Sequence, residues 1–258
     1  NQTDDANGCD DREGEEGEQQ EVQGGHRQAI GASHLFIEHE KQQFLEQTEN
    51  SRAFFEKLRQ EHKWENGSRW EISVFPPEFA QEKFSLSEAR RAAEKSYGNP
   101  IGSPFLDSDD VNEDYFTNVS YRMISLEQKC VLQVFSSGLF HYAKIFEEEN
   151  KVIDYTVLLR FVADAVAFLG KYYYELGYTD ELFSIMFRAS SVENLGMSVP
   201  RIKENQRKKT RSYVCKIPEI QVKIQRSAAD LMSGANEHSS RIFKELCERF
   251  NFPDGQHS

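Results

Sequence analysis

Residues 129–146, KCVLQVFSSGLFHYAKIF, contain two β-prone runs that meet at a short polar turn. Val131 to Phe135 and Leu139 to Phe146 are rich in β-branched and aromatic residues, and the Ser-Ser-Gly between them is typical of a hairpin. Gly138 readily adopts the positive φ that such a turn requires. A third run, Tyr121 to Leu126, precedes them across a polar Glu-Gln-Lys turn. We therefore expect a three-stranded antiparallel meander.

A long helix is predicted to follow the meander. Asp154 is a suitable N-cap, and Gly177 supplies a stop after Leu176. Between them, apolar residues recur at i, i+3, i+4 and i+7. The recurring positions are Val157, Leu158, Phe161, Val162, Ala165, Phe168, Leu169 and Tyr172. This stripe predicts a helix that packs on a core, and no cofactor site is needed to explain it.

The segments before the meander predict helix, strand and helix. Residues 35–62 carry spaced apolar side chains among Glu, Gln and Lys, which indicates one or two amphipathic helices. RWEISVFPPEF at 69–79 predicts a strand that ends at its two prolines, because proline cannot donate to a ladder. In the following helix, Ser85 and Glu88 have the spacing of a capping box.

After the long helix we expect a strand in residues 181–190, another in 213–225 and a closing helix in 238–252. The fold class is therefore α/β in the α+β sense. It has a mixed, largely antiparallel sheet, with the β-meander packed against the long helix and flanking helices covering one face.

The net charge of −12 is concentrated at one end of the chain. Residues 1–28 contain nine acidic residues against two arginines, few apolar residues and many Gly and Gln. Such a segment cannot offset the entropy of ordering, so residues 1–30 are expected to be a disordered acidic linker or tail. Residues 31–258 are then expected to form a single α/β domain, which is long enough to bury a core without disulfides.

No catalytic, metal or cofactor motif is present in the sequence. It lacks G-x-S-x-G, H-E-x-x-H, the phosphate-binding G-x-x-x-x-G-K-[ST] and G-x-G-x-x-G after a strand. The closest histidines, His34 and His39, have the wrong spacing for one helical face. Acids at 107–113 lack the register of a calcium loop and are better explained as a solvated loop. We expect no catalytic residues, no metal site and no cofactor.

The cysteines and apolar segments indicate a cytoplasmic protein. Cys9, Cys130, Cys215 and Cys247 are widely spaced, which favours buried free thiols over a disulfide framework or a zinc site. No apolar run approaches the roughly 20 residues that span a bilayer, and no secretory signal opens the chain. The three N-x-S/T matches at Asn1, Asn66 and Asn118 favour secretion, but such short matches arise readily by chance.

A cluster of cations opposes the overall acidity in a predicted loop at residues 201–211. Several cations on a mobile segment release counterions when they meet a nucleic-acid backbone, so weak, sequence-independent binding is one interpretation. A solvated loop is the other. The cluster consists of Arg201, Lys203, Arg207, Lys208, Lys209 and Arg211.

Three further residues are candidates for a pocket that only the folded chain would assemble. His141 falls on the strand face shared with Leu139, Ala143 and Ile145, so we expect it to be half surrounded by apolar neighbours. Arg122 and Glu219 are the polar partners we would place near it. An enzyme built on these residues is the alternative to a binding protein.

The order of these segments resembles the C-terminal domain that follows the nucleic-acid-binding module of prokaryotic Schlafen/AlbA-related DNA-binding proteins. The resemblance rests on the "Q-[LIV]-F-x-x-G" hairpin at Gln133–Gly138 and the "[LI]-P-E-[VI]" strand at Ile217–Ile220, and it covers about 200 residues. The sequence departs from the family in lacking a glycine-containing loop ahead of the hairpin, and in its extended basic loop.

The resemblance implies a non-catalytic accessory, sensing or interaction domain. Its partner would be another protein or a sister nucleic-acid-binding domain in the same chain, with nucleic acid itself as a further partner and no membrane. The acidic segment would then be the linker to that upstream module.

Overall fold

The computed structural model describes residues 41–64, 67–97, 111–148, 150–199 and 211–251. The chain divides into two compact units, Asn1–Gln43 and Phe44–Ser258, and the fold described below is that of the second unit. It is an α+β fold, as the sequence predicts.

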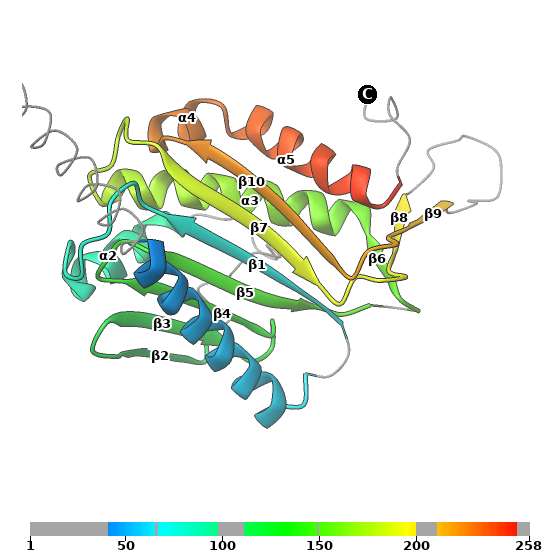
Figure 1. The fold of residues 1–258 in the computed structure, drawn as a ribbon, viewed down its shortest axis with the longest axis horizontal. Helices are drawn as coiled ribbons and strands as arrows, with labels where there is room; N and C mark the ends of the chain where they lie inside the picture. Colours follow the sequence, from blue (N-terminus) through cyan, green and yellow to red (C-terminus); the bar gives the residue numbers. More distant parts are fainter. Residues whose placement is uncertain (1–40, 65–66, 98–110, 149, 200–210, 252–258) are drawn as a thin grey trace, which may run out of the picture. The chain divides into compact units, whose positions relative to one another are not determined.

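A seven-stranded sheet in the order β10-β7-β1-β5-β4-β3-β2 forms the centre of the fold (Figure 1). Every pair of neighbouring strands in it is antiparallel. The strands are β1 (Ser68–Phe75), β2 (Glu113–Phe116), β3 (Ser120–Ser125), β4 (Cys130–Phe135), β5 (Phe140–Phe146), β7 (Phe183–Ser190) and β10 (Glu219–Arg226).

The predicted meander is confirmed as β3, β4 and β5, which pair in sequence order. Gly138 adopts φ +86° in the turn between β4 and β5 and donates its N–H to the Phe135 carbonyl at 2.9 Å. The hydroxyl of Tyr173, from the long helix, donates to the Gly138 carbonyl at 2.9 Å. The turn is therefore tied directly to the helix that covers the sheet.

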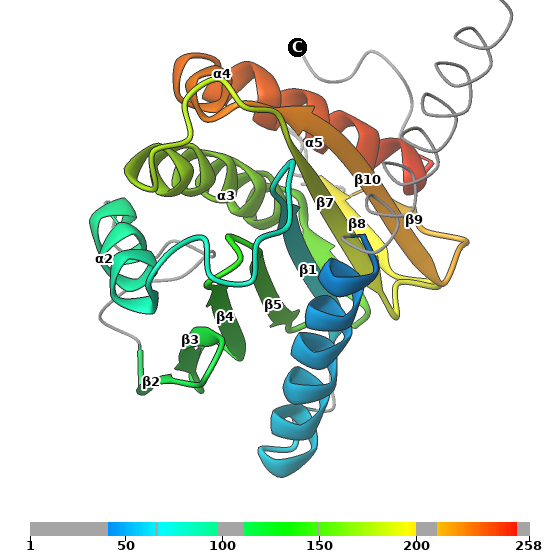
Figure 2. The same cartoon turned by 60° about the vertical axis from the view of Figure 1, so that its left-hand side comes forward.

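Four helices cover one face of this sheet: α2 (Leu86–Ser96), α3 (Tyr155–Glu175), α4 (Ala228–Ser233) and α5 (Ala235–Arg249). Figure 2 shows them together on one side. The main core lies between these helices and alternate strand residues such as Trp70, Ile72 and Tyr142. Burying large aromatic and aliphatic side chains from both layers supplies most of the stabilisation of such a fold.

The predicted ends of α2 and α3 are confirmed, whereas the closing helix α5 begins and ends three residues earlier than predicted. Ser85 caps α2, with its hydroxyl accepting from the Glu88 N–H while the Glu88 carboxylate accepts from the Ser85 N–H. Asp154 caps α3 by accepting from the Thr156 N–H at 2.7 Å. Gly177 follows the last turn with φ +86°, a conformation that costs glycine little.

The opposite face is partly covered by helical residues 44–61, which are called the covering helix below. This corrects the prediction that helices cover one face only. The covering helix buries Phe55 and Leu58 against β3, β4 and β5 in one small apolar cluster, and Phe44 against Phe135 and Leu139 in another. It crosses the sheet in Figures 1 and 2 on the side away from α3 and α5.

A second, three-stranded sheet contains β6 (Val152–Asp154), β8 (Gly196–Val199) and β9 (Arg211–Val214). It corrects the expectation of one strand over residues 213–225, because β9 joins this small sheet whereas β10 joins the large one. Pro218 lies between the two strands, where no backbone N–H is needed for strand pairing. Glu113 also departs from the loop prediction, since it begins β2.

None of the described helices combines the length and the apolar character needed to cross a lipid bilayer.

Candidate functional site

One row of side chains crosses the whole large sheet on the face that carries the covering helix. Residues directly opposite each other on neighbouring strands share a face, so the register assigns the row. In order across the sheet it consists of Tyr115, Arg122, Gln133, His141, Ser73, Met186 and Lys223. Two of the three predicted pocket residues, Arg122 and His141, therefore lie in one row with Gln133 between them.

The buried carboxylate of Glu71 is the electrostatic centre of this face. Its side chain is 1% exposed, and three guanidinium groups lie within ion-pair distance. Arg52 of the covering helix and Arg69 of β1 each place Nε at 3.3 Å from a carboxylate oxygen, and Nη1 of Arg188 from β7 lies at 3.5 Å. A carboxylate that has lost its water requires such compensation, since an isolated buried charge is costly.

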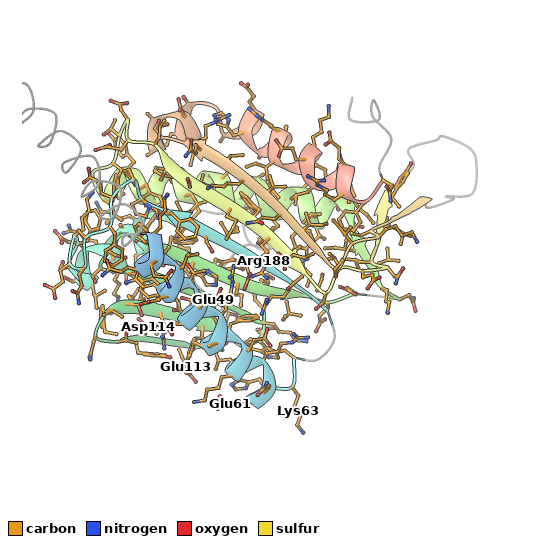
Figure 3. The ribbon with its side chains drawn as sticks, in the orientation of Figure 1. Glu49, Glu61, Lys63, Glu113, Asp114 and Arg188 are labelled. Carbon is orange, nitrogen blue, oxygen red and sulfur yellow. The ribbon has the colours of Figure 1, made fainter. Side chains whose placement is uncertain are left out.

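Each arginine around Glu71 has a second acidic partner nearer the solvent. Arg52 pairs with Glu49 at 2.5 Å, Arg69 pairs with Glu56, and Arg188 pairs with Glu219 at 2.6 Å. Figure 3 labels Glu49 on the covering helix and Arg188 on β7, which mark the two sides of this group. Each of the three cations is therefore shared between Glu71 and an outer carboxylate, and Glu56 also pairs with Arg59.

His141 is fully buried, with 1% of its surface exposed. Its Nδ1 lies 3.0 Å from the Ser73 hydroxyl. Burial lowers the pKa of His141 to about 3, and the positive charges of the three arginines around Glu71 lower it in the same direction. His141 is therefore a neutral imidazole at physiological pH. Leu139 and Ala143, its neighbours on the same strand face, are buried apolar residues, while Ser73 and the arginines supply polar and charged neighbours.

Gln133 connects this row to the covering helix. The Ser51 hydroxyl donates to Oε1 of Gln133 at 3.0 Å and also lies 3.0 Å from the Gln47 carbonyl. The Ser137 hydroxyl of the β4–β5 turn donates to Oε1 of Gln47 at 2.8 Å. Hydrogen bonds form only at particular distances and angles. These bonds therefore fix the position of the covering helix along the sheet, which apolar contacts alone do not specify.

Arg122 takes part in aromatic contacts. Its guanidinium carbon lies 4.0 Å from the ring centroid of Phe54 and 5.9 Å from that of Tyr115. Stacking of a guanidinium on an aromatic face is favourable and links Phe54 of the covering helix to β2 and β3. Arg122 is thus a packing residue in this structure.

The structure places the three predicted pocket residues on one face, but it does not bring them to one point. Arg122 and His141 are two strands apart, which corresponds to roughly 10 Å between backbones. Glu219 lies three strands from His141 on β10, about 14 Å across the sheet, and is offset along it. Burial and the arginine charges lower the pKa of His141, and the hydrogen bond with Arg188 lowers the pKa of Glu219. No shared reacting position follows from this geometry.

Several buried polar atoms under the covering helix have no hydrogen-bond partner among the described residues. They include Nε2 of His141, Nε2 of Gln133 and Oε1 of Glu71. The contact between Arg69 and Glu71 is therefore ionic and lacks hydrogen-bond geometry. His141 has the protonation state of a general base, and it is 1% exposed in this structure.

The other half of this face, over β7 and β10, is not covered by any described helix. Alternate residues of the two strands point to it, while the residues between them, such as Ile185 and Val222, are buried in the main core. We call this half the open face. It consists of Ser184, Met186, Arg188, Ser190, Glu219, Gln221, Lys223 and Gln225.

Among the described residues no group of three or more His, Cys, Asp and Glu side chains is arranged to hold a metal ion. Cys130, Cys215 and Cys247 are buried free thiols. Burial raises the pKa of the Cys247 thiol to about 12 and raises that of Cys215. Both thiols are therefore protonated and unreactive.

Five of the six residues in the predicted nucleic-acid-binding cluster, Arg201 to Lys209, lie outside the described residues. The sixth, Arg211, begins β9, where its backbone pairs with Val199 of β8. Asp107 to Asp110 of the acidic loop also lie outside the described part of the chain.

Sequence analysis missed the group around Glu71. The signal was the alternation in RWEIS, which places Arg69, Glu71 and Ser73 on the strand face opposite Trp70 and Ile72. Alternation predicts a solvated polar face in a half-buried strand, and only the covering helix changes that outcome.

The fold and this face define a class of α+β protein. Among the described residues, its antiparallel sheet has four helices on one side and one helix across half of the other. No protein-family model matches the chain, and no curated protein matches it.

Proposed function

We propose that this chain is a non-catalytic interaction or sensing domain of a Schlafen/AlbA-like protein associated with nucleic acid in the prokaryotic cytoplasm. Its open face would hold a protein partner or a sister nucleic-acid-binding domain. The observation that carries the proposal is the unequal coverage of one sheet face. Half is sealed by the covering helix, while the two eight-residue strands β7 and β10 present alternate side chains outward.

The composition of the open face supports this role. Five of its eight side chains are uncharged, and two of the three charged ones, Arg188 and Glu219, are paired with each other. A flat surface of this kind loses little charge solvation when a partner covers it. Depletion of unpaired charge together with enrichment in Met and Arg is typical of the central part of protein interfaces.

The closed state of the Glu71 group supports binding over catalysis. A general acid or base must reach its substrate within hydrogen-bond distance. Glu71 is held among three arginines and His141 is enclosed beneath the covering helix. The three buried thiols support a reducing compartment.

The proposal is tested by capture of partners from the native cells with a tagged full-length protein. The double variant Met186→Glu/Gln221→Glu places two new charges on the open face. The matched control, Ala53→Glu/Gln60→Glu, places two charges on exposed positions of the covering helix. We expect the wild type and the control to retain a partner that the open-face variant loses. An identical set of captured proteins for all three would overturn the proposal.

A second candidate function is nucleic-acid binding through residues 201–211. The pairing of Val199 with Arg211 favours it, because both ends of the basic segment meet at one place on the small sheet. Each phosphate contact steepens the dependence of log K on log salt by about 0.9 for duplex DNA. Neutralising Lys208, Lys209 and Arg211 should reduce that slope by up to roughly 3. Retention that survives the triple substitution would remove this candidate.

A further inference from the structure

The outer edge of β10 is a free strand edge. β10 is the last strand of the sheet, and on that side no described backbone group hydrogen-bonds to it. In an edge strand every second residue directs its N–H and C=O away from the neighbouring strand. Alternate residues of the eight in β10 therefore expose a row of donors and acceptors that another extended chain can complete.

A groove of about 570 Å³ lies at this edge. Its walls come from β10, from α4 and from α5, which runs beside β10 in both Figure 1 and Figure 2. Leu182 and Ile224 give it an apolar part, and Leu182 is 56% exposed. The lining residues are Leu182, Lys223, Ile224, Gln225, Arg226, Asp230 and Arg241.

The groove is basic although the whole chain is acidic. Lys223, Arg226 and Arg241 line it against the single acid Asp230. Lys223 has no ion-pair partner among the described residues, and Arg241 has only an exposed partner, Glu245, at 3.5 Å. The unbalanced charge attracts an anionic ligand.

Arg226 is held in place at the groove. Its Nε donates to Nδ1 of His238 on α5 at 3.1 Å, and Nη1 donates to the Gln225 carbonyl at 2.6 Å. Neither acceptor is a carboxylate, so these two bonds leave the guanidinium charge available to an anionic ligand. A cation fixed in this way loses little side-chain entropy when a carboxylate binds to it.

We propose that the β10 edge binds an extended acidic segment of a partner protein by strand addition. The backbone of that segment would pair with β10, and its carboxylates would meet Lys223, Arg226 and Arg241. Its apolar side chains would contact Leu182 and Ile224. This inference rests on the proposed interaction function and names the chemistry of the partner.

A second copy of the chain is a poorer occupant. The acid on β10 itself, Glu219, is paired with Arg188 at 2.6 Å. A copy pairing edge to edge would therefore offer no free carboxylate from β10 to the three cations. A partner rich in unpaired Glu or Asp supplies the missing charge.

The test measures binding of fluorescent peptides to the full chain by anisotropy. The probe is an eight-residue peptide that alternates Val and Glu. One control peptide has Lys in place of Glu, and another has proline at two central positions, which removes the N–H groups needed for pairing. We expect saturable binding of the probe and at least tenfold weaker binding of both controls.

The matched protein variants are Arg241→Glu and Lys244→Glu, which change the same charge on the exposed side of α5. Arg241 lines the groove, and Lys244 is not among the lining residues. We expect Arg241→Glu to weaken binding about fivefold or more, the effect of roughly 1 kcal/mol, and Lys244→Glu to have a much smaller effect. Bound peptide should also slow amide exchange at alternate residues of β10.

Four outcomes overturn the inference. They are failure of the probe peptide to bind, equal effects of the two variants, equal binding of the proline peptide, and a peptide-independent dimer that Lys223→Glu dissolves. The proposed interaction function has its own test in the open-face double variant. If the open-face variant loses a captured partner but the probe peptide does not bind, the interaction function is retained and the acidic strand is rejected.

Discussion

Ser73 and His141 lie directly opposite each other on β1 and β5, and the Ser73 hydroxyl is 3.0 Å from Nδ1 of the imidazole. Both side chains are buried beneath the covering helix. The pair superficially resembles a nucleophile and its base. Its burial and the positive charges around it make the contribution of His141 to stability depend on pH.

The first prediction concerns that pH dependence. His141 stays neutral in the folded protein down to about pH 3, whereas the unfolded chain protonates near pH 6.5. The unfolded state therefore binds the extra proton between these values, and stability falls as the pH falls through that range. Between pH 7 and pH 5 we expect His141 to account for a loss of about 2 kcal/mol in the free energy of unfolding.

Denaturant unfolding at both pH values, with wild type and His141→Gln, measures this contribution. The variant keeps a polar group opposite Ser73 but does not titrate, so it should lose about 2 kcal/mol less than wild type between pH 7 and pH 5. Equal losses for the two proteins would contradict the assigned neutral state.

The second prediction concerns the buried carboxylate. Glu71→Gln removes the charge that compensates Arg52, Arg69 and Arg188, and we expect it to lower the free energy of unfolding by about 3 kcal/mol. The control is Glu94→Gln, which breaks the exposed pair with Arg90 and should cost less than about 0.5 kcal/mol. Similar costs for both substitutions would show that the Glu71 group is not desolvated.

The third prediction compares two glycines with the same φ of +86°. An added Cβ at Gly138 would lie 3.1 Å from Cγ of Pro76 and 3.2 Å from Cε2 of Phe84, while one at Gly177 meets nothing within 4 Å. Gly177→Ala therefore measures backbone strain alone, about 1 kcal/mol, and Gly138→Ala should cost about 1–2 kcal/mol more. Thermal unfolding of the two variants measures this difference in stability. Equal melting temperatures would contradict the prediction that the turn at Gly138 is crowded.

The fourth prediction concerns the attachment of the covering helix. Phe55 belongs to a small apolar cluster, whereas Phe161 belongs to the separate main core. Removing a buried phenyl ring costs about 3–5 kcal/mol. We expect Phe55→Ala to accelerate amide exchange mainly in residues 44–61, and Phe161→Ala to accelerate it in α3 and the central strands as well. Uniform acceleration by Phe55→Ala would show that the helix and the main core unfold as one unit.

Local signals in the sequence determined the meander, the ends of α2 and α3, and the main core. Each depends on residues close together in the chain. Ser85 and Glu88 form one cap, Gly138 closes one turn, and the 3.6-residue repeat of α3 gives one apolar stripe. Such short-range patterns fix backbone conformation without knowledge of distant contacts. The α+β class follows from their order.

Only the tertiary structure decided the environment of the polar strand face. Alternation of polar and apolar residues predicts that polar side chains on this face are solvated. Arg188 and Lys223 do lie at a surface, but Glu71 and His141 are buried. The difference is the position of one helix, set by Phe44, Phe55 and the Ser51 bond to Gln133, 82 residues away. Burial changes the energy of a charge far more than any neighbour in sequence does, so the site depends on packing that no local pattern encodes.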